Sequence, residues 1–352
     1  MAALRGDELS TGSVDNPQTA GAEFLSRSLV GQRMATGDIR ESVEETAEEI
    51  ATMEVRGAAT IAREAVEALR VQATESTAGD AEQFKAELRA AARRLHETRP
   101  TAVSLPNSLR FVLERMEGDD LATARESVVS AADEFLARLE RAQTDLGRIG
   151  ANRLQDGDVV MTHCHSTDVL ACIETAREQG KELEAVVKET RPRKQGHLTA
   201  EQLREWDVPV TMIVDSAATR FIDDVDHVFV GADSIRADGS VINKIGTRGL
   251  ALLAQDVGTP VTVAAQTLKL DPDTFAGHTV EIESRDDAEV ISEDERADIG
   301  DIEVANPAFD VTPPRYVDAL VTERGLFPPE GVVALMRELY GTAPNRPWEE
   351  ES

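Results

Sequence analysis

Lysine is the residue type that this sequence most clearly avoids. It contains six lysines against 31 arginines, and its 66 acidic residues outnumber the 37 basic ones, so the net charge at pH 7 is −29. A charge of this sign disfavours nucleic acid as a partner, because the phosphate backbone would be repelled. Together with the lack of lysine, it favours an acid-coated surface adapted to a high-salt cytoplasm over an ordinary acidic protein.

Cysteine and long apolar runs are scarce as well. The two cysteines, Cys164 and Cys172, are expected to be free thiols in a reducing compartment rather than a disulfide framework. No run of 18 apolar residues occurs, so a membrane-spanning helix is not expected. Residues 1–21 lack the apolar core of a signal peptide. These absences predict a soluble cytoplasmic protein with no membrane partner, in which residues 1–20 form a poorly ordered extension.

Two regions with different periodicity follow that extension. Up to residue 151 the apolar residues recur at helical spacing, most clearly in a long stripe from Leu121 to Ile149. This pattern predicts a helical N-terminal domain over residues 21–151. From residue 152 onward, short apolar runs alternate with helical stretches, and the runs lie at residues 159–162, 185–187, 210–214, 228–230 and 261–264. That alternation predicts an α/β class domain over residues 152–352, Rossmann-like, with a mainly parallel sheet.

A polar cluster follows each of the five predicted strands. The clusters are HCHS at 163–166, ETRP at 189–192, DSA at 215–217, GAD at 231–233 and QTLK at 266–269. Ligands of parallel sheets bind beyond the carboxyl ends of the strands, so these clusters predict one site at one edge of the sheet. The glycine patterns of dinucleotide-binding and P-loop proteins are absent, so neither ligand class has its fingerprint here.

Two residues in these clusters are candidates for acid–base chemistry. Cys164 lies between a strand and the start of a helix, where the helix dipole would stabilise a thiolate. The alternative is an inert buried thiol, which is our interpretation of Cys172. Asp233 ends an apolar strand, where burial would raise the pKa of its carboxyl and suit it to general acid catalysis. A metal site is not expected, because adjacent residues of the His-Cys-His run at 163–165 alternate sides in an extended chain and no second ligand cluster occurs.

Several of the few cations also lie in loops, next to glycine, proline or the end of a strand. Each one alone would usually be an ordinary surface charge, but together they suggest a substrate with two anionic groups, which arginine can bind in a bidentate manner. A helix that begins at residues 246–248 should offer further free N–H groups to an anion. The cations are Arg56, Arg99, Arg191, Arg193, Lys194, Lys244 and Lys269.

The motifs taken together resemble the archaeal ribose-1,5-bisphosphate isomerase family. The resemblance covers roughly residues 26–341. It is carried by MEVRGA at 53–58, RPTAV at 99–103, THCHS at 162–166, ETRP at 189–192, VGAD at 230–233, VINKIG at 241–246, NPAFDVTPP at 306–314 and TERG at 322–325. This family is similar to methylthioribose-1-phosphate isomerase and to the regulatory subunits of the exchange factor for eukaryotic initiation factor 2. That relationship implies a helical domain, a Rossmann-like domain, and a homo-oligomer that is a dimer or a hexamer.

The resemblance also implies a reaction and a set of site residues. The substrate would be α-D-ribose 1,5-bisphosphate and the product D-ribulose 1,5-bisphosphate, formed without a cofactor during AMP breakdown. Cys164 would be the base and Asp233 the acid. The remaining substrate contacts implied by the resemblance are Arg56, Gly57 and Ala58 on one phosphate, Arg99, Ser166 and Lys269 on phosphate or sugar, and Asn243 and Lys244 on hydroxyls or developing charge.

Two other functions remain open at this point. Methylthioribose-1-phosphate isomerase typically reads CNTG at the cysteine, where this chain reads CHST at 164–167. A non-catalytic regulatory subunit would generally lack the pair of Cys164 and Asp233. Gln266 departs from the family, where a Glu is more usual, and this departure affects the expectation around Lys269.

Overall fold

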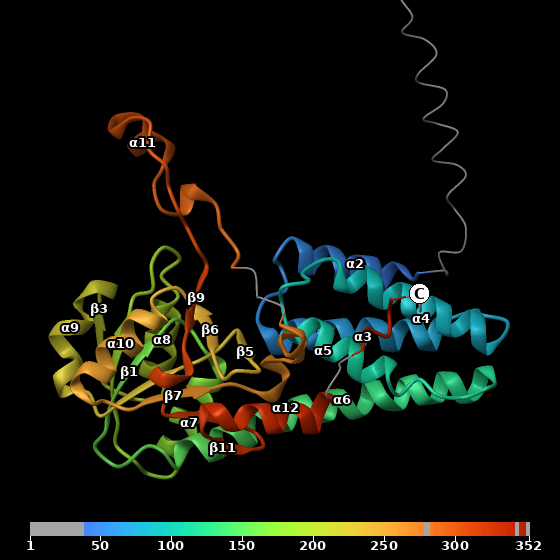
Figure 1. The fold of residues 1–352 in the computed structure, drawn as a ribbon, viewed down its shortest axis with the longest axis horizontal. Helices are drawn as coiled ribbons and strands as arrows, with labels where there is room; N and C mark the ends of the chain where they lie inside the picture. The colour runs from blue at the N-terminus through green and yellow to red at the C-terminus, as the bar shows by residue number, and fades with distance from the viewer. Residues whose placement is uncertain (1–38, 278–281, 342–344, 350–352) are drawn as a thin grey trace, which may run out of the picture.

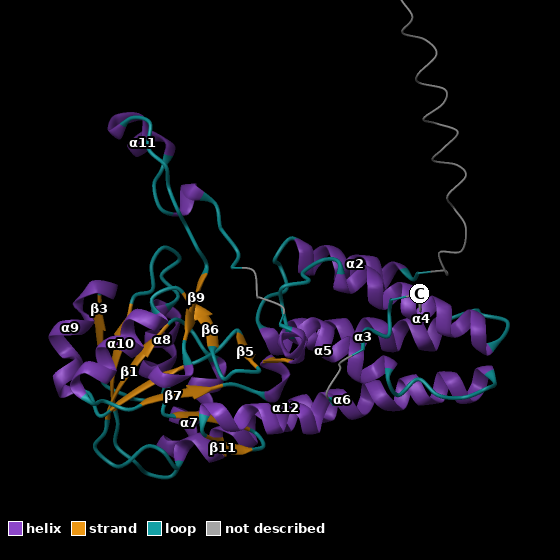
Figure 2. Cartoon of the chain, in the orientation of Figure 1, coloured by secondary structure: helices purple, strands orange, loops and turns teal. Residues whose placement is uncertain are grey.

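The computed structural model describes residues 39–277, 282–341 and 345–349 (Figure 1). A bundle of helices lies at one end of the molecule, and a sheet with helices on both faces lies at the other (Figure 2). The extension predicted for residues 1–20 lies outside the described residues.

The described part of the bundle contains five helices whose apolar stripes meet in one core. Leu88 and Phe135 are both buried in it. The longest helix begins after Asp120, whose side chain accepts a hydrogen bond from the Thr123 N–H, and its far end leaves the bundle so that Leu146 packs against the sheet. The helices are α2 (Glu41–Ala51), α3 (Ala58–Glu75), α4 (Ala81–His96), α5 (Ser104–Leu113) and α6 (Leu121–Ala151). Because α6 ends at residue 151, we propose to keep the division there between two domains.

The larger sheet is almost entirely parallel. Its described strands lie in the order β11-β10-β7-β4-β1-β2-β3, and only β11 pairs antiparallel, with β10. The strands are β1 (Val159–His163), β2 (Glu184–Lys188), β3 (Val210–Ile213), β4 (His227–Val230), β7 (Val261–Ala264), β10 (Ala319–Thr322) and β11 (Gly325–Phe327). All five predicted strands are present, with ends that differ from the prediction by a residue or so.

Helices cover both faces of this sheet. The end of α6, α7 (Thr167–Glu178) and α8 (Gly196–Glu205) pack on the face that carries Phe229 and Val321. The short α9 (Ala218–Phe221), α10 (Thr247–Val257) and α12 (Val332–Tyr340) cover the face that carries Val228 and Leu320. The predicted α/β class with a mainly parallel sheet is therefore confirmed. None of the helices in the described ranges combines the length and apolar character needed to cross a membrane.

A second, smaller sheet was not predicted. Its strand order is β8-β5-β6-β9, with β5 (Ser234–Arg236), β6 (Val241–Lys244), β8 (Leu270–Asp271) and β9 (Phe309–Thr312). An arm formed by residues 282–308 leads into the start of β9 and carries α11 (Glu293–Ile299) at its tip (Figure 1). The small sheet follows the carboxyl end of β4 along the chain, because β5 begins directly after the GAD cluster.

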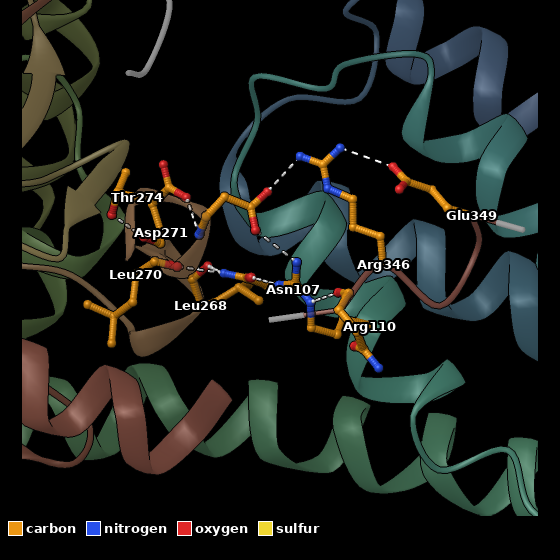
Figure 3. A network of polar contacts seen from close by, with 10 residues as sticks. Asn107, Arg110, Leu268, Leu270, Asp271, Thr274, Arg346 and Glu349 are labelled. Carbon is orange, nitrogen blue, oxygen red and sulfur yellow. Dashed lines mark hydrogen bonds and ion pairs between the residues drawn. The ribbon is translucent and has the colours of Figure 1, made fainter. Parts of the chain in front are cut away.

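A buried polar network fastens α5 to the loop that follows β7 (Figure 3). The side-chain amide of Asn107 donates to the carbonyl oxygens of Leu268, at 2.9 Å, and Leu270, at 2.7 Å. Arg110 donates to the Asn107 Oδ1 at 2.8 Å and forms an ion pair with Asp273 at 3.2 Å. The bundle and the sheet are therefore joined by directed hydrogen bonds as well as by α6.

Replacing Asn107 by Ala should lower the free energy of unfolding by about 2–4 kcal/mol, because one buried carbonyl, one part-buried carbonyl and one guanidinium group lose a partner. Urea denaturation followed by circular dichroism measures the change. Gln143→Ala, on the exposed face of α6, is the control and should change stability by less than about 0.5 kcal/mol. Equal stability of the two variants would show that the network contributes nothing.

Candidate active site

The order of the strands defines where a ligand should bind. From β1 the chain leads outward to β2 and β3, and from the adjacent β4 it leads the other way to β7 and β10. A crevice forms at the carboxyl ends where the direction reverses, and ligands of open α/β sheets bind there. Cys164 directly follows β1, and Asp233 follows β4 by three residues. The two candidate acid–base residues therefore flank the point of reversal.

A cavity of about 700 Å³ occupies this position and is lined by both the bundle and the sheet. The structure brings all ten sequence-predicted site residues to its wall. They are Arg56, Gly57, Ala58, Arg99, Cys164, Ser166, Asp233, Asn243, Lys244 and Lys269.

The backbone of Cys164 is held by two threonines. Its φ of 72° is in the left-handed region, which a non-glycine residue occupies only when its surroundings enforce it. The Cys164 N–H donates to the Thr190 Oγ1 at 2.8 Å, and the Thr199 hydroxyl donates to the Cys164 carbonyl at 2.9 Å. Both threonines are buried. The thiol is therefore presented to the cavity by a fixed backbone rather than by a flexible loop.

Burial decides the protonation of that thiol. It raises the pKa of Cys164 to about 11, although Lys244 lowers it. The helix dipole predicted the opposite direction, and burial outweighs it here. The resting Cys164 is therefore a neutral thiol at neutral pH, which corrects the expectation of a stable thiolate.

The pKa of Asp233 is shifted in the direction that suits a general acid. Its carboxyl is open to the water in the cavity, yet the surrounding protein replaces most of the bulk solvent. That enclosure outweighs the local opening, because the wall of the cavity restricts how water can screen the charge. Desolvation raises the pKa of Asp233, and the nearby Lys269 and Lys244 oppose it.

The first turn of α3 faces the cavity with free peptide N–H groups. Gly57 caps this helix with a φ of 87°, and no side chain in the described part of the chain accepts a hydrogen bond from the first turn. No acidic residue lies in that turn, and Arg56 precedes it. A helix start of this kind is suited to binding phosphate.

The prediction of an anion-binding site at the start of α10 is wrong. Asp310 accepts hydrogen bonds from the N–H groups of Gly246, at 2.8 Å, and Arg248, at 3.1 Å. A carboxylate of the protein therefore already occupies that helix start. Asn243 is close by, and its amide donates to the Thr247 hydroxyl at 3.0 Å.

Lys269 and Arg99 of the cavity wall each have a carboxylate partner. Lys269 lies 2.8 Å from the buried Asp168, which also accepts a hydrogen bond from the Gln266 amide at 3.0 Å. Gln266 thus serves to hold the partner of Lys269. Arg99 lies 3.6 Å from Glu283, at the base of the arm.

Ser166 combines capping with close packing. Its hydroxyl accepts a hydrogen bond from the Val169 N–H and so begins α7. A Cβ at residue 231 would lie 2.4 Å from the Ser166 Oγ, so only Gly231 allows this approach. The strand end of β4 and the start of α7 therefore meet at the floor of the cavity.

His163 is neutral and structural. It is buried, its Nε2 lies 2.8 Å from the Ile245 carbonyl, and burial lowers its pKa to about 4. His165 is half-buried beside Thr199. Among the described residues, no group of three or more His, Cys, Asp or Glu side chains is arranged to hold a metal ion.

Not every predicted cluster reaches the cavity. Asp215 instead accepts hydrogen bonds from the N–H groups of Thr190, at 3.1 Å, and Arg191, at 2.7 Å, and so shapes the loop after β2. Arg191 and Lys194 do not line the cavity, whereas Arg193 does. Residues of the wall that the sequence analysis did not single out include Gln195 and Arg285, whereas Phe309 lies in the motif at 306–314 but was given no role there.

Comparison with known proteins agrees with this geometry. The model of the initiation factor 2 subunit family matches residues 54–329. The chain belongs to that family. A ribose 1,5-bisphosphate isomerase from Haloferax volcanii is 68% identical over 314 residues, which are 89% of this chain and 97% of that protein. Identity at this level makes this chain an enzyme of the isomerase class. The organism of that relative, Haloferax volcanii, fits the predicted adaptation to salt.

Solved structures of the family include both enzymes and translation factors. The 5-methylthioribose 1-phosphate isomerase from Pyrococcus horikoshii has a TM-score of 0.68 at 32% identity and covers 84% of this chain and 88% of its own. The translation initiation factor eIF-2B from the same organism has a TM-score of 0.71 at 32% identity and covers 84% of this chain and 99% of its own. The fold alone therefore does not select between the functions of this family.

Thr190→Val should reduce isomerase turnover by about tenfold or more with little change in KM, because the Cys164 N–H loses its acceptor and the thiol is misplaced. Thr190→Ser should restore turnover. Thr262→Val is the matched control, since Thr262 is equally buried but its hydroxyl has no hydrogen-bond partner among the described residues. Steady-state kinetics of the three variants measure the effect, and an equal loss in Thr190→Val and Thr262→Val would rule out a positioning role.

Iodoacetamide should alkylate Cys164 slowly at pH 7 and about tenfold faster with each pH unit, until the pH approaches its pKa. That pKa is about 11. Peptide mass spectrometry follows the rate, with the fully buried Cys172 as an internal control that stays unlabelled. A rate that is already maximal at pH 7 would contradict the effect of burial on Cys164.

Proposed function

We propose that this protein is an aldose–ketose isomerase that converts α-D-ribose 1,5-bisphosphate into D-ribulose 1,5-bisphosphate. The observation that supports it most strongly is the cavity itself. A thiol and a carboxyl flank the reversal point of the sheet, and the wall around them carries a helix start and several cations. A sugar with two phosphates needs such an arrangement, with acid–base groups between anion-binding groups.

The first steps open the sugar ring. A phosphate on O1 prevents the ring from opening by itself, so the enzyme must protonate the ring oxygen. Asp233 gives its proton to that oxygen, and the bond between the ring oxygen and C1 breaks. Cys164, as thiolate, removes the proton from C2, and the C2 hydroxyl returns a proton to Asp233, which leaves a cis-phosphoenolate. Return of the proton from Cys164 to C1 gives the ketose and restores both groups.

The resting protonation states are compatible with this sequence of steps. Asp233 raises the pKa of Cys164, so ionisation of both groups at once is unfavourable. At least one of the two groups therefore keeps its proton, and the productive arrangement has a proton on Asp233 and the negative charge on Cys164. Lys244, which lowers the pKa of Cys164 more than any other group, stabilises this arrangement.

The remaining predicted residues bind the substrate. Arg56, Gly57 and Ala58 hold one phosphate at the start of α3. The other contacts are Arg99, Ser166 and Lys269 on phosphate or sugar, and Asn243 and Lys244 on hydroxyls or the charge of the enolate. No cofactor takes part, and the product enters further metabolism within AMP breakdown.

We also propose that the chain forms a homo-oligomer, a dimer or a hexamer. The outer strand β3 supports this proposal, because its side chain Met212 is 40% exposed and Val214, directly after it, is 55% exposed. An apolar strand at the edge of a sheet favours association with another surface.

Incubation of the protein with ribose 1,5-bisphosphate in concentrated KCl should yield ribulose 1,5-bisphosphate, and NMR detects this product. Cys164→Ser and Asp233→Asn should each reduce turnover by about 10²–10⁴-fold while substrate still binds, since each removes one proton-transfer group. Cys172→Ser is the matched control and should retain activity.

Two outcomes of the same assay would overturn the proposal. Faster conversion of methylthioribose 1-phosphate than of the bisphosphate would assign the protein to that reaction instead. Absence of turnover with either sugar, together with copurification of an initiation factor, would favour a regulatory subunit.

A further inference from the structure

The C-terminal part of the chain returns from the sheet to the helical bundle. Helix α12 packs on the large sheet, where its Val332 and Met336 are buried. Trp348, close to the C-terminus, is instead buried in the core of the bundle, with only 1% of its surface exposed. Residues 345–349, which we call the strap, therefore lie on the other domain from α12.

A tight turn gives the strap its shape. The Glu349 N–H donates to the Arg346 carbonyl at 2.8 Å, and Pro347 occupies the second position of this turn. Proline favours that position because its φ is already fixed. The Arg346 side chain also donates to the Glu349 carboxylate at 3.0 Å (Figure 3). The backbone around Trp348 is thus shaped by local contacts before it meets the bundle.

Two arginines of the bundle hold the backbone of the strap. Arg93 of α4 donates to the Trp348 carbonyl through Nε, at 3.1 Å, and through Nη2, at 2.7 Å. Arg110 of α5 donates from its Nε to the Asn345 carbonyl at 2.8 Å. The indole ring packs 4.9 Å from the ring of His96 and 5.9 Å from the Arg110 Cζ. The strap is therefore docked through its backbone and through one aromatic side chain.

Arg110 also connects the strap to the segment that carries Lys269. The Arg110 Nη2 lies 3.2 Å from one carboxylate oxygen of Asp273, and Arg346 of the strap lies 3.1 Å from the other (Figure 3). Asp273 ends the segment that the Asn107 amide fastens to α5. The strap, α5 and this segment of the sheet domain thus meet at one carboxylate, so the strap lies across the joint between the domains.

The candidate active site depends on the spacing of the two domains. The bundle supplies Arg56 and Arg99 to the wall of the cavity, and the sheet domain supplies Cys164 and Asp233. A substrate that touches both sets of side chains reacts efficiently only at one spacing, because small displacements of reacting groups reduce the rate strongly. None of residues 345–349, all of which are described, lines the cavity. The strap can therefore affect the reaction only through the joint.

The strap can leave the bundle without unfolding the rest of the protein. It is short, and its Asn345, Arg346 and Glu349 are exposed. The ion pair between Arg346 and Asp273 is open to solvent, so salt weakens it. Docking then depends mainly on the buried indole of Trp348, whose apolar contacts salt does not screen. Terminal segments held by so few buried groups open locally at a lower free energy than the whole domain.

We propose that Trp348 is a positioning residue and that the strap couples substrate binding to the spacing of the domains. The docked strap holds the spacing that the reaction needs, and bound substrate holds the strap docked. This proposal rests on the proposed function, because its substrate is the bisphosphate. Coupling is reciprocal, so loss of the strap weakens substrate binding by the factor by which substrate suppresses strap opening. A merely structural segment would show neither effect.

Two substitutions weaken docking to different extents. Trp348→Ala should reduce the affinity for ribose 1,5-bisphosphate, measured by calorimetry, and kcat/KM by about 10–100-fold. Trp348→Phe should recover most of both. Arg93→Met removes the donors to the Trp348 carbonyl without leaving a large cavity, and should reduce both parameters by about threefold or more, because the competent state is less populated.

Arg94→Met is the matched control. Arg94 is the next residue of α4, is also half-buried, and pairs with Glu44 at 2.7 Å rather than with the strap. Its replacement should change affinity and kcat/KM by less than about twofold. Equal losses in Arg93→Met and Arg94→Met would overturn the role of the strap and leave the isomerase reaction intact.

Acrylamide quenching of Trp348 fluorescence measures strap opening directly. The chain has two tryptophans, so Trp206→Phe protein reports on Trp348 alone. A saturating concentration of the bisphosphate, at reaction equilibrium, should slow the quenching by about the factor that Trp348→Ala loses in affinity. Quenching that ignores bound substrate would also overturn the coupling, even where Trp348→Ala fails to fold.

The same measurements separate this proposal from the proposed function. Protein that binds the bisphosphate and protects Trp348 from acrylamide, but forms no ribulose 1,5-bisphosphate, would refute the isomerase reaction alone. If the bisphosphate does not bind at all, both proposals fail.

Discussion

The amide of Asn107 holds together the two halves of the candidate active site. Its two N–H groups donate to the carbonyls of Leu268 and Leu270, and its oxygen accepts from Arg110, so every polar group of this buried side chain is satisfied. Leu268 and Leu270 are the neighbours of Lys269 on either side. The contact therefore fixes the bundle against the segment that carries a cavity lysine. A purely apolar contact would allow sliding, whereas directed hydrogen bonds define one relative position.

The positively charged side chains of the cavity are also held in place by neighbouring residues. Of the few lysines, Lys244 and Lys269 line the cavity and Lys188 is buried behind it, with a pKa lowered by burial. Arginine carries most of the remaining positive charge of the chain. Since Arg285 and Lys244 share one aromatic ring while Lys269 shares a carboxylate with Gln266, each cation is oriented by a neighbour. Oriented cations recognise phosphate with less loss of side-chain entropy than free ones.

Local patterns in the sequence were sufficient for β1, β2, β3, β4 and β7 of the large sheet and for the ends of these strands, whereas β10 and β11 were not predicted. Parallel topology brings strand ends to one edge, so Cys164 and Asp233 could be assigned to one site before any coordinates. The small sheet escaped notice because β8 has two residues and β5 three, too short for a recognisable period. Arg285 escaped because it lies in an acidic segment and reaches the cavity only through pairing across the arm. Asp310 occupies the start of α10 from 64 residues away, a contact that no local pattern contains.

An acidic surface and an anionic substrate are compatible because salt acts differently on the two. At molar ionic strength the screening length is about 3 Å, so the net charge of −29 has little long-range effect on an approaching sugar phosphate. The contacts that the cavity arginines would make with the phosphate oxygens of the proposed substrate are shorter than this length and lie away from the bulk solvent. Their strength is therefore retained where the surface field is lost. The sequence restricts lysine on the surface and keeps it where contact is direct, which is the distribution that binding of an anion in high salt requires.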